Sequence, residues 1–142
     1  MGTKLSRIDF RRQYVSAYQG LFVCCNAKRM IKDQPTINIG QKLSDALLAL
    51  PPDQRCTMVE RCLMQVIGSE KAMNLTHIEV LFTPSLHLDV LGVLHSLCRN
   101  RKICVHWPGH IIDGKLCYAD LNMPEYYEAD FTGYVDTFVA ED

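Results

Sequence analysis

The residues with the clearest chemical potential lie at the end of the first buried strand that the sequence predicts, over residues 20–25. Active sites of open α/β sheets gather at such strand ends, and this one carries the adjacent thiols of Cys24 and Cys25. Either thiol could act as a nucleophile if His77 or His106, near the ends of other predicted strands, served as its base. Neighbouring strand residues point to opposite faces, so at most one thiol could serve. No Ser or Asp motif of hydrolase type accompanies them, which favours a role as buried strand residues.

The connection that follows this strand lacks the loop with which many α/β proteins bind nucleotides. A second strand is predicted over residues 36–39, and the connection, residues 26–35, contains no glycine. A phosphate-binding loop of the form Gly-x-x-x-x-Gly-Lys-Ser/Thr needs glycines whose backbone N–H groups wrap the phosphates, a Lys that neutralises them and a hydroxyl that holds Mg²⁺. The sequence therefore predicts no ATP hydrolysis and no cofactor.

Five His residues invite a metal-site interpretation, which their spacing does not favour. His87 and His95 are eight positions apart on one predicted helix, a rise of about 12 Å that a single Zn²⁺ cannot bridge. His106 and His110 flank a short turn and could approach each other, but loop or capping roles are commoner for such a pair. We therefore predict no metal site.

Two short clusters of cationic residues are candidates for contact with phosphate, DNA or an acidic protein. They are Lys28, Arg29 and Lys32 in the glycine-free connection, and Arg99, Arg101 and Lys102 between a predicted helix and the next strand. If strand ends bring the clusters together, the resulting positive patch could meet nucleic-acid phosphates or an acidic surface. The alternative is a solvated face, with cations that suit the negative pole of the preceding helix.

Aromatic residues gather in the last third of the chain, at Trp107, Tyr118, Tyr126 and Tyr127. Rings with one polar group are typical anchors of protein interfaces, although packing beneath a carboxyl-terminal loop explains them equally well. The predicted partner-binding residues are Arg99, Arg101, Trp107 and Tyr126.

Length and composition indicate one globular domain over residues 1–142. The 15 Lys and Arg against 16 Asp and Glu give a net charge of −1, so no global positive field draws the chain to nucleic acid or membrane. The amino terminus has no signal-peptide core, and no apolar run is long enough to span a bilayer. Seven Cys residues, an odd number without CxxC spacing, are typical of buried free thiols. We therefore expect a cytoplasmic protein with no membrane contact.

Apolar periodicity predicts alternating helices and strands. Helices are expected over residues 4–19, 41–50, 53–67 and 86–98, and strands over residues 20–25, 36–39, 75–82, 102–107 and 134–139. The first helix carries a basic face of Arg7, Arg11 and Arg12, and Asp113 with Gly114 forms the turn of a hairpin over residues 111–118. These elements predict a three-layer α/β domain with a mainly parallel sheet, helices on both faces and a carboxyl-terminal hairpin and aromatic segment.

Several short runs, in order across about residues 20–127, resemble BrxF, the small P-loop protein of one type of BREX phage-defence cluster. They include Ile37-Asn38-Ile39, Ile78-Glu79-Val80-Leu81-Phe82, Leu97-Cys98-Arg99-Asn100-Arg101, Trp107 with Gly109, and Pro124-Glu125-Tyr126. The resemblance implies a P-loop-type fold.

Three departures from that family matter for function. The glycine-rich loop with its Lys-Thr pair is missing, Thr76 stands where the resemblance implies a Mg²⁺-binding Asp, and Pro108 replaces a polar residue after the Trp. Without these groups the charge of a triphosphate and its metal has no partner. The resemblance therefore implies a degenerate P-loop domain, a pseudo-ATPase whose fold serves as an interaction surface.

Three functions follow from these observations. The leading hypothesis is a non-catalytic accessory or assembly subunit of a bacterial anti-phage complex, which contacts larger protein subunits and could also self-associate. The alternative is a DNA-contacting regulatory or targeting module that uses the cationic residues. A third is residual nucleotide binding in an unconventional cradle around Asn26 and Lys28.

Overall fold

The computed structural model describes residues 2–142 and is built around a six-stranded sheet in the order β1–β9–β2–β5–β4–β3. Every neighbouring pair in this sheet is parallel. Its strands are β1 (Thr3–Leu5), β2 (Gly20–Cys24), β3 (Thr36–Asn38), β4 (Ala72–Thr76), β5 (Lys102–His106) and β9 (Thr137–Ala140). The predicted α/β class with a mainly parallel sheet is confirmed.

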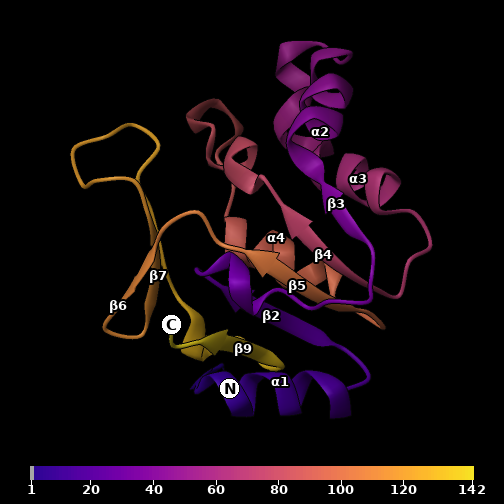
Figure 1. Cartoon of the computed structure of the whole chain (residues 1–142). Coiled ribbons are helices and arrows are strands. Elements are labelled where there is room, and N and C mark those ends of the chain that lie inside the picture. The colour runs from indigo at the N-terminus through magenta and orange to yellow at the C-terminus, as the bar shows by residue number, and fades with distance from the viewer. Residues whose placement is uncertain (1) are drawn as a thin grey trace.

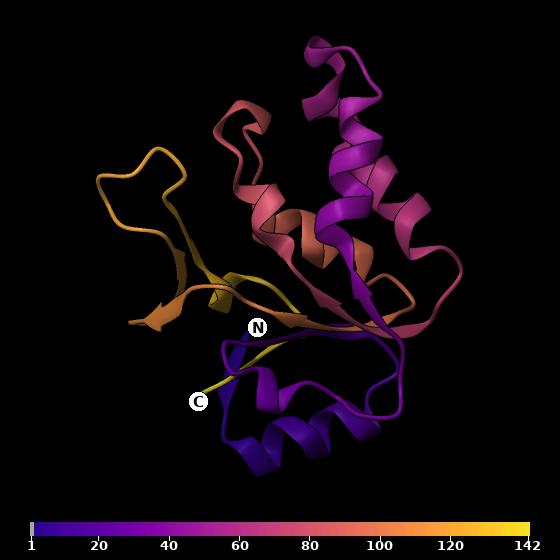
Figure 2. The same ribbon diagram turned by 45° about the horizontal axis from the view of Figure 1, so that its top comes forward.

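Helices cover both faces of the sheet, as the sequence predicts (Figures 1 and 2). Helix α1 (Arg7–Ser16) lies on one face, and α2 (Ile39–Leu48), α3 (Arg55–Ile67) and α4 (Val90–Leu97) lie on the other. The buried strand β2 separates two cores, because alternate side chains point to opposite faces. Leu21 and Val23 join the core beneath α2–α4, whereas Phe22 and Cys24 join the core beneath α1.

The face beneath α1 is held by an aromatic cluster and a short crossover segment, residues 26–35. Phe10 and Tyr14 of α1 meet the ring of Phe22 edge-on, with centroid distances of 5.7 and 4.8 Å. The crossover segment occupies the position in the chain at which a helix would follow a phosphate-binding loop. Apart from the 3₁₀ turn η1 (Ala27–Arg29), it is irregular.

Asn74, in the middle of β4, fixes the crossover segment to the sheet. Its side chain accepts from the N–H of Ile31 (3.3 Å) and donates to the C=O of the same residue (2.6 Å). It also accepts from the Gln34 amide at 2.9 Å and donates to the Thr36 hydroxyl at 3.1 Å. Asn74 is only 2% exposed, so a buried polar side chain holds the crossover segment in addition to the hydrophobic contacts of Met30 and Ile31.

The strand predicted over residues 75–82 is confirmed only at Leu75 and Thr76 and is wrong from His77 onward. The strand is β4, after which His77 takes a left-handed conformation (φ 59°) and the 3₁₀ helix η3 (Ile78–Phe82) begins. Turns of η3 bury Ile78, Leu81 and Phe82 together, which produces an apolar run without a strand. A second 3₁₀ turn, η4 (Pro84–Leu86), delays the next helix to Val90.

The carboxyl-terminal third forms a separate antiparallel sheet of β6 (His110–Ile112), β7 (Lys115–Tyr118) and β8 (Tyr127–Asp130). The predicted hairpin is confirmed, and its turn residues Asp113 and Gly114 have φ values of 50° and 78°. After the 3₁₀ turn η5 (Phe131–Gly133), β9 enters the large sheet between β1 and β2. A further 3₁₀ turn, η2 (Pro52–Gln54), precedes α3. Within residues 2–142, none of the helices has the length and apolar character needed to traverse a bilayer.

Candidate functional site

A groove with cationic walls lies between α1 and the crossover segment. Its volume is about 270 Å³. It is lined by Arg7, Ile8, Phe10, Arg11, Lys28, Arg29, Met30 and Ile31, and we call it the basic groove. Arg7 and Arg11 are one helical turn apart and therefore share a face of α1. On the opposite wall, the Asn26 side chain accepts from the Lys28 N–H at 3.0 Å and fixes η1. The first predicted cationic cluster therefore meets the basic face of α1.

The floor of the basic groove is apolar, and two buried thiols lie behind its Met30 side chain. Phe10 is fully buried there, and Met30 packs against the same core. The Met30 Sδ atom lies 3.4 Å from Cys24 Sγ and 3.9 Å from Cys104 Sγ. Charged groups therefore surround an opening that ends on hydrophobic side chains.

A carboxylate of the chain itself pairs with one of the cationic side chains that line the groove. Asp142 accepts two hydrogen bonds from the Arg29 guanidinium, Nε to Oδ1 at 3.3 Å and Nη2 to Oδ2 at 2.9 Å. These bonds lower the pKa of Asp142 below its ordinary value, and the nearby charge of Arg7 lowers it further. The wall thus binds a carboxylate in the paired geometry that guanidinium groups favour.

The two thiols at the end of β2 are poorly suited to nucleophilic chemistry. Cys24 is fully buried, and its contact with the Cys104 thiol, together with burial, raises its pKa strongly. Burial raises the pKa of Cys25 to about 11. His77, one of the two candidate bases for these thiols, has its Nδ1 atom 3.0 Å from the Thr76 hydroxyl. Because their pKa values are raised, both thiols are protonated at neutral pH. The thiolate is the reactive form, so neither thiol is activated as a nucleophile. Across residues 2–142, no three His, Cys, Asp or Glu side chains are grouped to hold a metal ion.

The two cationic clusters do not form one patch, so this prediction is wrong. Strands β2 and β5 run parallel with Gly20 opposite Lys102 and Cys24 opposite His106, which places Lys102 at the amino-terminal edge of the sheet. Lys28 follows the carboxyl end of β2 and lies at the other edge. Arg7 and Arg11 of α1 take the place that the prediction gave to the second cluster.

The second cluster mainly holds the fold together. Arg101 donates to the backbone carbonyls of Gly68 and Glu70, each at 3.1 Å, and so closes the chain after α3. Lys102 donates to the Tyr14 carbonyl at 3.0 Å and lies over the Tyr14 ring. Arg99, also in the second cluster, is exposed. Lys32, of the first cluster, is exposed on the crossover segment and does not line the groove.

The prediction that Trp107 anchors a partner is wrong, because its ring is 0% exposed. Its Nε1–H donates to the Cys117 carbonyl at 2.9 Å, and its ring packs edge-on against Phe82 with centroids 5.3 Å apart. The alternative, packing beneath the carboxyl-terminal segment, describes it correctly. Tyr126 is partly exposed, and its hydroxyl donates to Glu128 at 2.7 Å.

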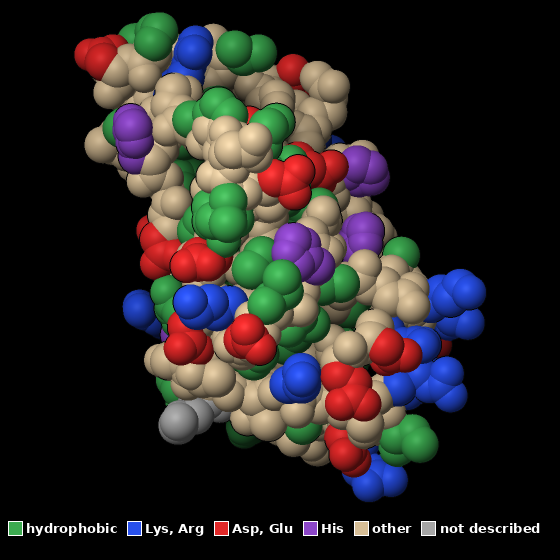
Figure 3. Space-filling model, turned by 90° about the vertical axis from the view of Figure 1, so that its left-hand side faces the viewer, with side chains coloured by type: hydrophobic (Ala, Val, Ile, Leu, Met, Phe, Trp, Pro, Cys, Tyr) green, Lys and Arg blue, Asp and Glu red, His purple; other side chains and the backbone are tan. Residues whose placement is uncertain are grey.

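Around Tyr126 the small sheet displays hydrophobic side chains, with Ile112 52%, Leu121 82% and Met123 45% exposed. Figure 3 shows the side of the molecule that carries this sheet, where hydrophobic side chains mix with acidic and His side chains. Lys and Arg side chains gather along its right-hand margin. Tyr126 therefore remains a predicted partner contact.

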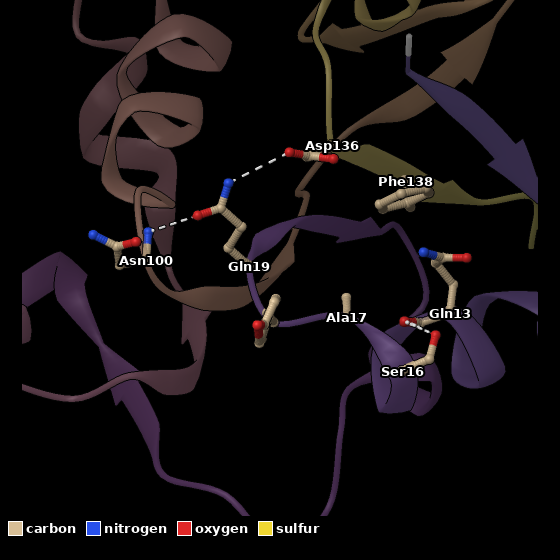
Figure 4. A pocket seen from close by; sticks show the side chains of 8 residues that line it. Gln13, Ser16, Ala17, Gln19, Asn100, Asp136 and Phe138 are labelled. Atoms are coloured by element: carbon tan, nitrogen blue, oxygen red, sulfur yellow. Dashed lines mark hydrogen bonds between the residues drawn. The ribbon is translucent and has the colours of Figure 1, made fainter.

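A larger depression of about 670 Å³ lies at the amino-terminal edge of the sheet (Figure 4). Gln19 spans it, accepting from the Asn100 N–H at 3.0 Å and donating to Asp136 at 3.5 Å. Asp136 is the single charged residue among those that line it. The depression thus offers hydrogen-bonding groups but no acid–base pair.

Sequence reasoning missed Asn74 and the contribution of Arg7 and Arg11 to the groove. The sequence carries a signal for Asn74, because a polar Asn stands between the hydrophobic Met73 and Leu75. Prediction of the groove requires the position of the crossover segment relative to α1, which no local sequence pattern gives. Comparisons of the chain with family models, with curated proteins and with solved structures gave no match.

Proposed function

We propose that the chain is a non-catalytic accessory subunit of a bacterial anti-phage defence complex, a BrxF-like domain that has lost nucleotide binding. The defence context comes from the sequence resemblance. The non-catalytic character has support from the geometry at the end of β2, where a P-loop protein would hold its phosphates.

The observation that carries the proposal is the use of four consecutive backbone N–H groups after Asn26. Those of Lys28 and Ile31 donate to the side chains of Asn26 (3.0 Å) and Asn74 (3.3 Å). Those of Arg29 and Met30 donate to the backbone carbonyls of Asn26 and Ala27, at 2.9 and 3.2 Å. A phosphate cradle needs such groups directed outward at the ligand. Here each already has an internal acceptor.

Titration of the purified protein with Mg²⁺–ATP in a calorimeter tests the non-catalytic part. We expect no binding, because neither backbone donors nor a metal-binding carboxylate are presented. Micromolar, Mg²⁺-dependent affinity would contradict the proposal.

Co-expression with the products of its neighbouring genes, followed by purification through a tag on this chain, tests the subunit role. We expect a stable complex and loss of phage resistance when the gene is deleted. Unchanged resistance together with a free protein would count against the role.

The second candidate, a DNA-contacting module, is favoured by one observation: four cationic side chains, Arg7, Arg11, Lys28 and Arg29, surround one groove. If all four contacted duplex phosphates, the logarithm of the affinity would fall with that of the salt concentration with a slope of about −3.6. A gel-shift series in increasing salt measures this slope, and a flat response would exclude the candidate.

A further inference from the structure

We propose that the basic groove binds a short acidic peptide segment bearing an apolar side chain, and that Asp142 competes with it for Arg29. This inference deepens the proposed function, on which it rests, by naming the chemistry of the partner. It assigns the docking surface to α1 and the crossover segment.

Unbalanced positive charge is the first argument for an anionic occupant. Among residues 2–142, no carboxylate lies within 4.0 Å of the cationic groups of Arg7, Arg11 or Lys28, and Arg29 pairs with Asp142 alone. Arg7 and Arg11 repel each other across one helical turn. The chain as a whole is slightly acidic, so this charge is local.

The apolar content of the groove favours a peptide over nucleic acid. Ile8 is 64% exposed at its margin, and Met30 and Ile31 are partly exposed within it. A phosphate backbone would gain nothing from these side chains, whereas a Leu or Phe between two carboxylates would cover them. A volume of about 270 Å³ suits one or two side chains.

The chain itself supplies an example of the binding mode. The Glu141 N–H donates to the Leu5 carbonyl at 2.9 Å. This bond continues the pairing of β9 with β1 and brings the Asp142 carboxylate to Arg29. A carboxylate of the chain therefore already binds Arg29, one of the cationic side chains that line the groove. A partner segment of the same chemistry would displace Asp142 and engage the remaining cations.

Fluorescence anisotropy with a labelled hexapeptide of alternating Asp and Leu tests the proposal. We expect binding by the full chain that weakens by about tenfold or more in the double variant Arg11→Glu, Lys28→Glu, because two attractive charges become repulsive. The matched control is Lys42→Glu, Arg61→Glu, which makes the same change of net charge at exposed positions outside the groove. It should change the affinity by about twofold or less. Circular dichroism verifies that both variants are folded.

The competitor is tested with Asp142→Asn, which should tighten peptide binding by a few-fold. Asp113→Asn, an exposed position on the hairpin turn, is the matched control and should leave the affinity unchanged.

Three outcomes would overturn the inference: equal losses in the two double variants, equal binding of a hexapeptide of alternating Asp and Ser, or tighter binding of a thymidine oligonucleotide. The last would favour the DNA-contacting module. The ATP titration does not involve the groove, and co-purification of the unaltered chain requires no particular interface, so failure of this inference is distinguishable from failure of the proposed function. A complex that forms despite the groove variant would move the interface to the face around Tyr126.

Discussion

The two faces of the parallel sheet are covered in different ways. Beneath α2–α4, hydrophobic side chains of three helices and η3 form one large core that extends to the small sheet. Beneath α1, a smaller cluster around Phe22 is completed by the crossover segment, which Asn74 holds by hydrogen bonds. A connection without an α-helix can thus cover a sheet if a buried polar side chain pairs with its backbone.

The difference has a functional consequence. The face beneath α2–α4 is covered by hydrophobic side chains. On the other face, the hydrogen bonds of Asn74 hold the crossover segment so that Lys28 and Arg29 line the groove beside α1. The basic groove exists because the crossover segment is short and irregular. Variants on each face can test whether the two hydrophobic clusters contribute independently to the stability of the fold.

The largest effect is expected on the hydrophobic face, from Trp107→Ala. Removal of a fully buried ring should lower the free energy of unfolding by about 3–5 kcal/mol. Urea denaturation followed by circular dichroism measures the change, since the variant lacks the only Trp of the chain.

Trp107→Phe separates packing from hydrogen bonding at this site. It keeps a ring but leaves the Cys117 carbonyl without its donor, so we expect a loss of about 1–3 kcal/mol. A Trp107→Ala loss below about 1 kcal/mol would mean that the small sheet is not packed as described.

A smaller and more local effect is expected on the other face, from Asn74→Ala. Loss of its bonds to Ile31 and Gln34 should cost about 1–3 kcal/mol. Hydrogen exchange should accelerate in residues 28–34 but not at Leu21 or Ile103, on the hydrophobic face. Equal acceleration at all sites would show that the two faces unfold as one unit. Asn122→Ala, at an exposed position without a positive φ, is the matched control.

The smallest effect concerns the pH dependence of the pair Arg29 and Asp142. Because hydrogen bonds from Arg29 lower the pKa of Asp142, the pair stabilises the fold above the unfolded-state pKa of 3.8 and loses this contribution as pH falls through the lower folded-state value. In Arg29→Gln, the pKa of Asp142 should rise towards its ordinary value in a carboxylate NMR titration. Asp130, whose pKa is lowered by Thr132, is an internal control and should not change.

Local sequence signals predicted the elements whose burial depends on their own pattern. The apolar runs of β2 and β5 and the Asp113–Gly114 turn were read correctly, because strand patterning and turn chemistry are local. The run of residues 78–82 was read as a strand because its hydrophobicity is continuous, but a left-handed His77 redirects the chain into η3. That turn depends on tertiary packing, which overrides propensity.

The candidate site was predictable only in part. Lys28 and Arg29 stood out as a cluster, but their neighbours on α1 are about 20 residues away in sequence and meet them only because Asn74 draws the crossover segment across that face. Trp107 was misplaced for a related reason. Its burial depends on a small sheet that folds back from the following residues, which no local pattern encodes.

The position of β9 has a consequence for biosynthesis. Strand β1, near the first residue, has β9 as its neighbour in the sheet, and β9 also flanks β2 (Figure 1). During translation, β1 and one edge of β2 emerge from the ribosome long before the strand that separates them. We expect the nascent chain to expose two unpaired strand edges until residues 137–140 are released, a period in which a chaperone would protect it from aggregation.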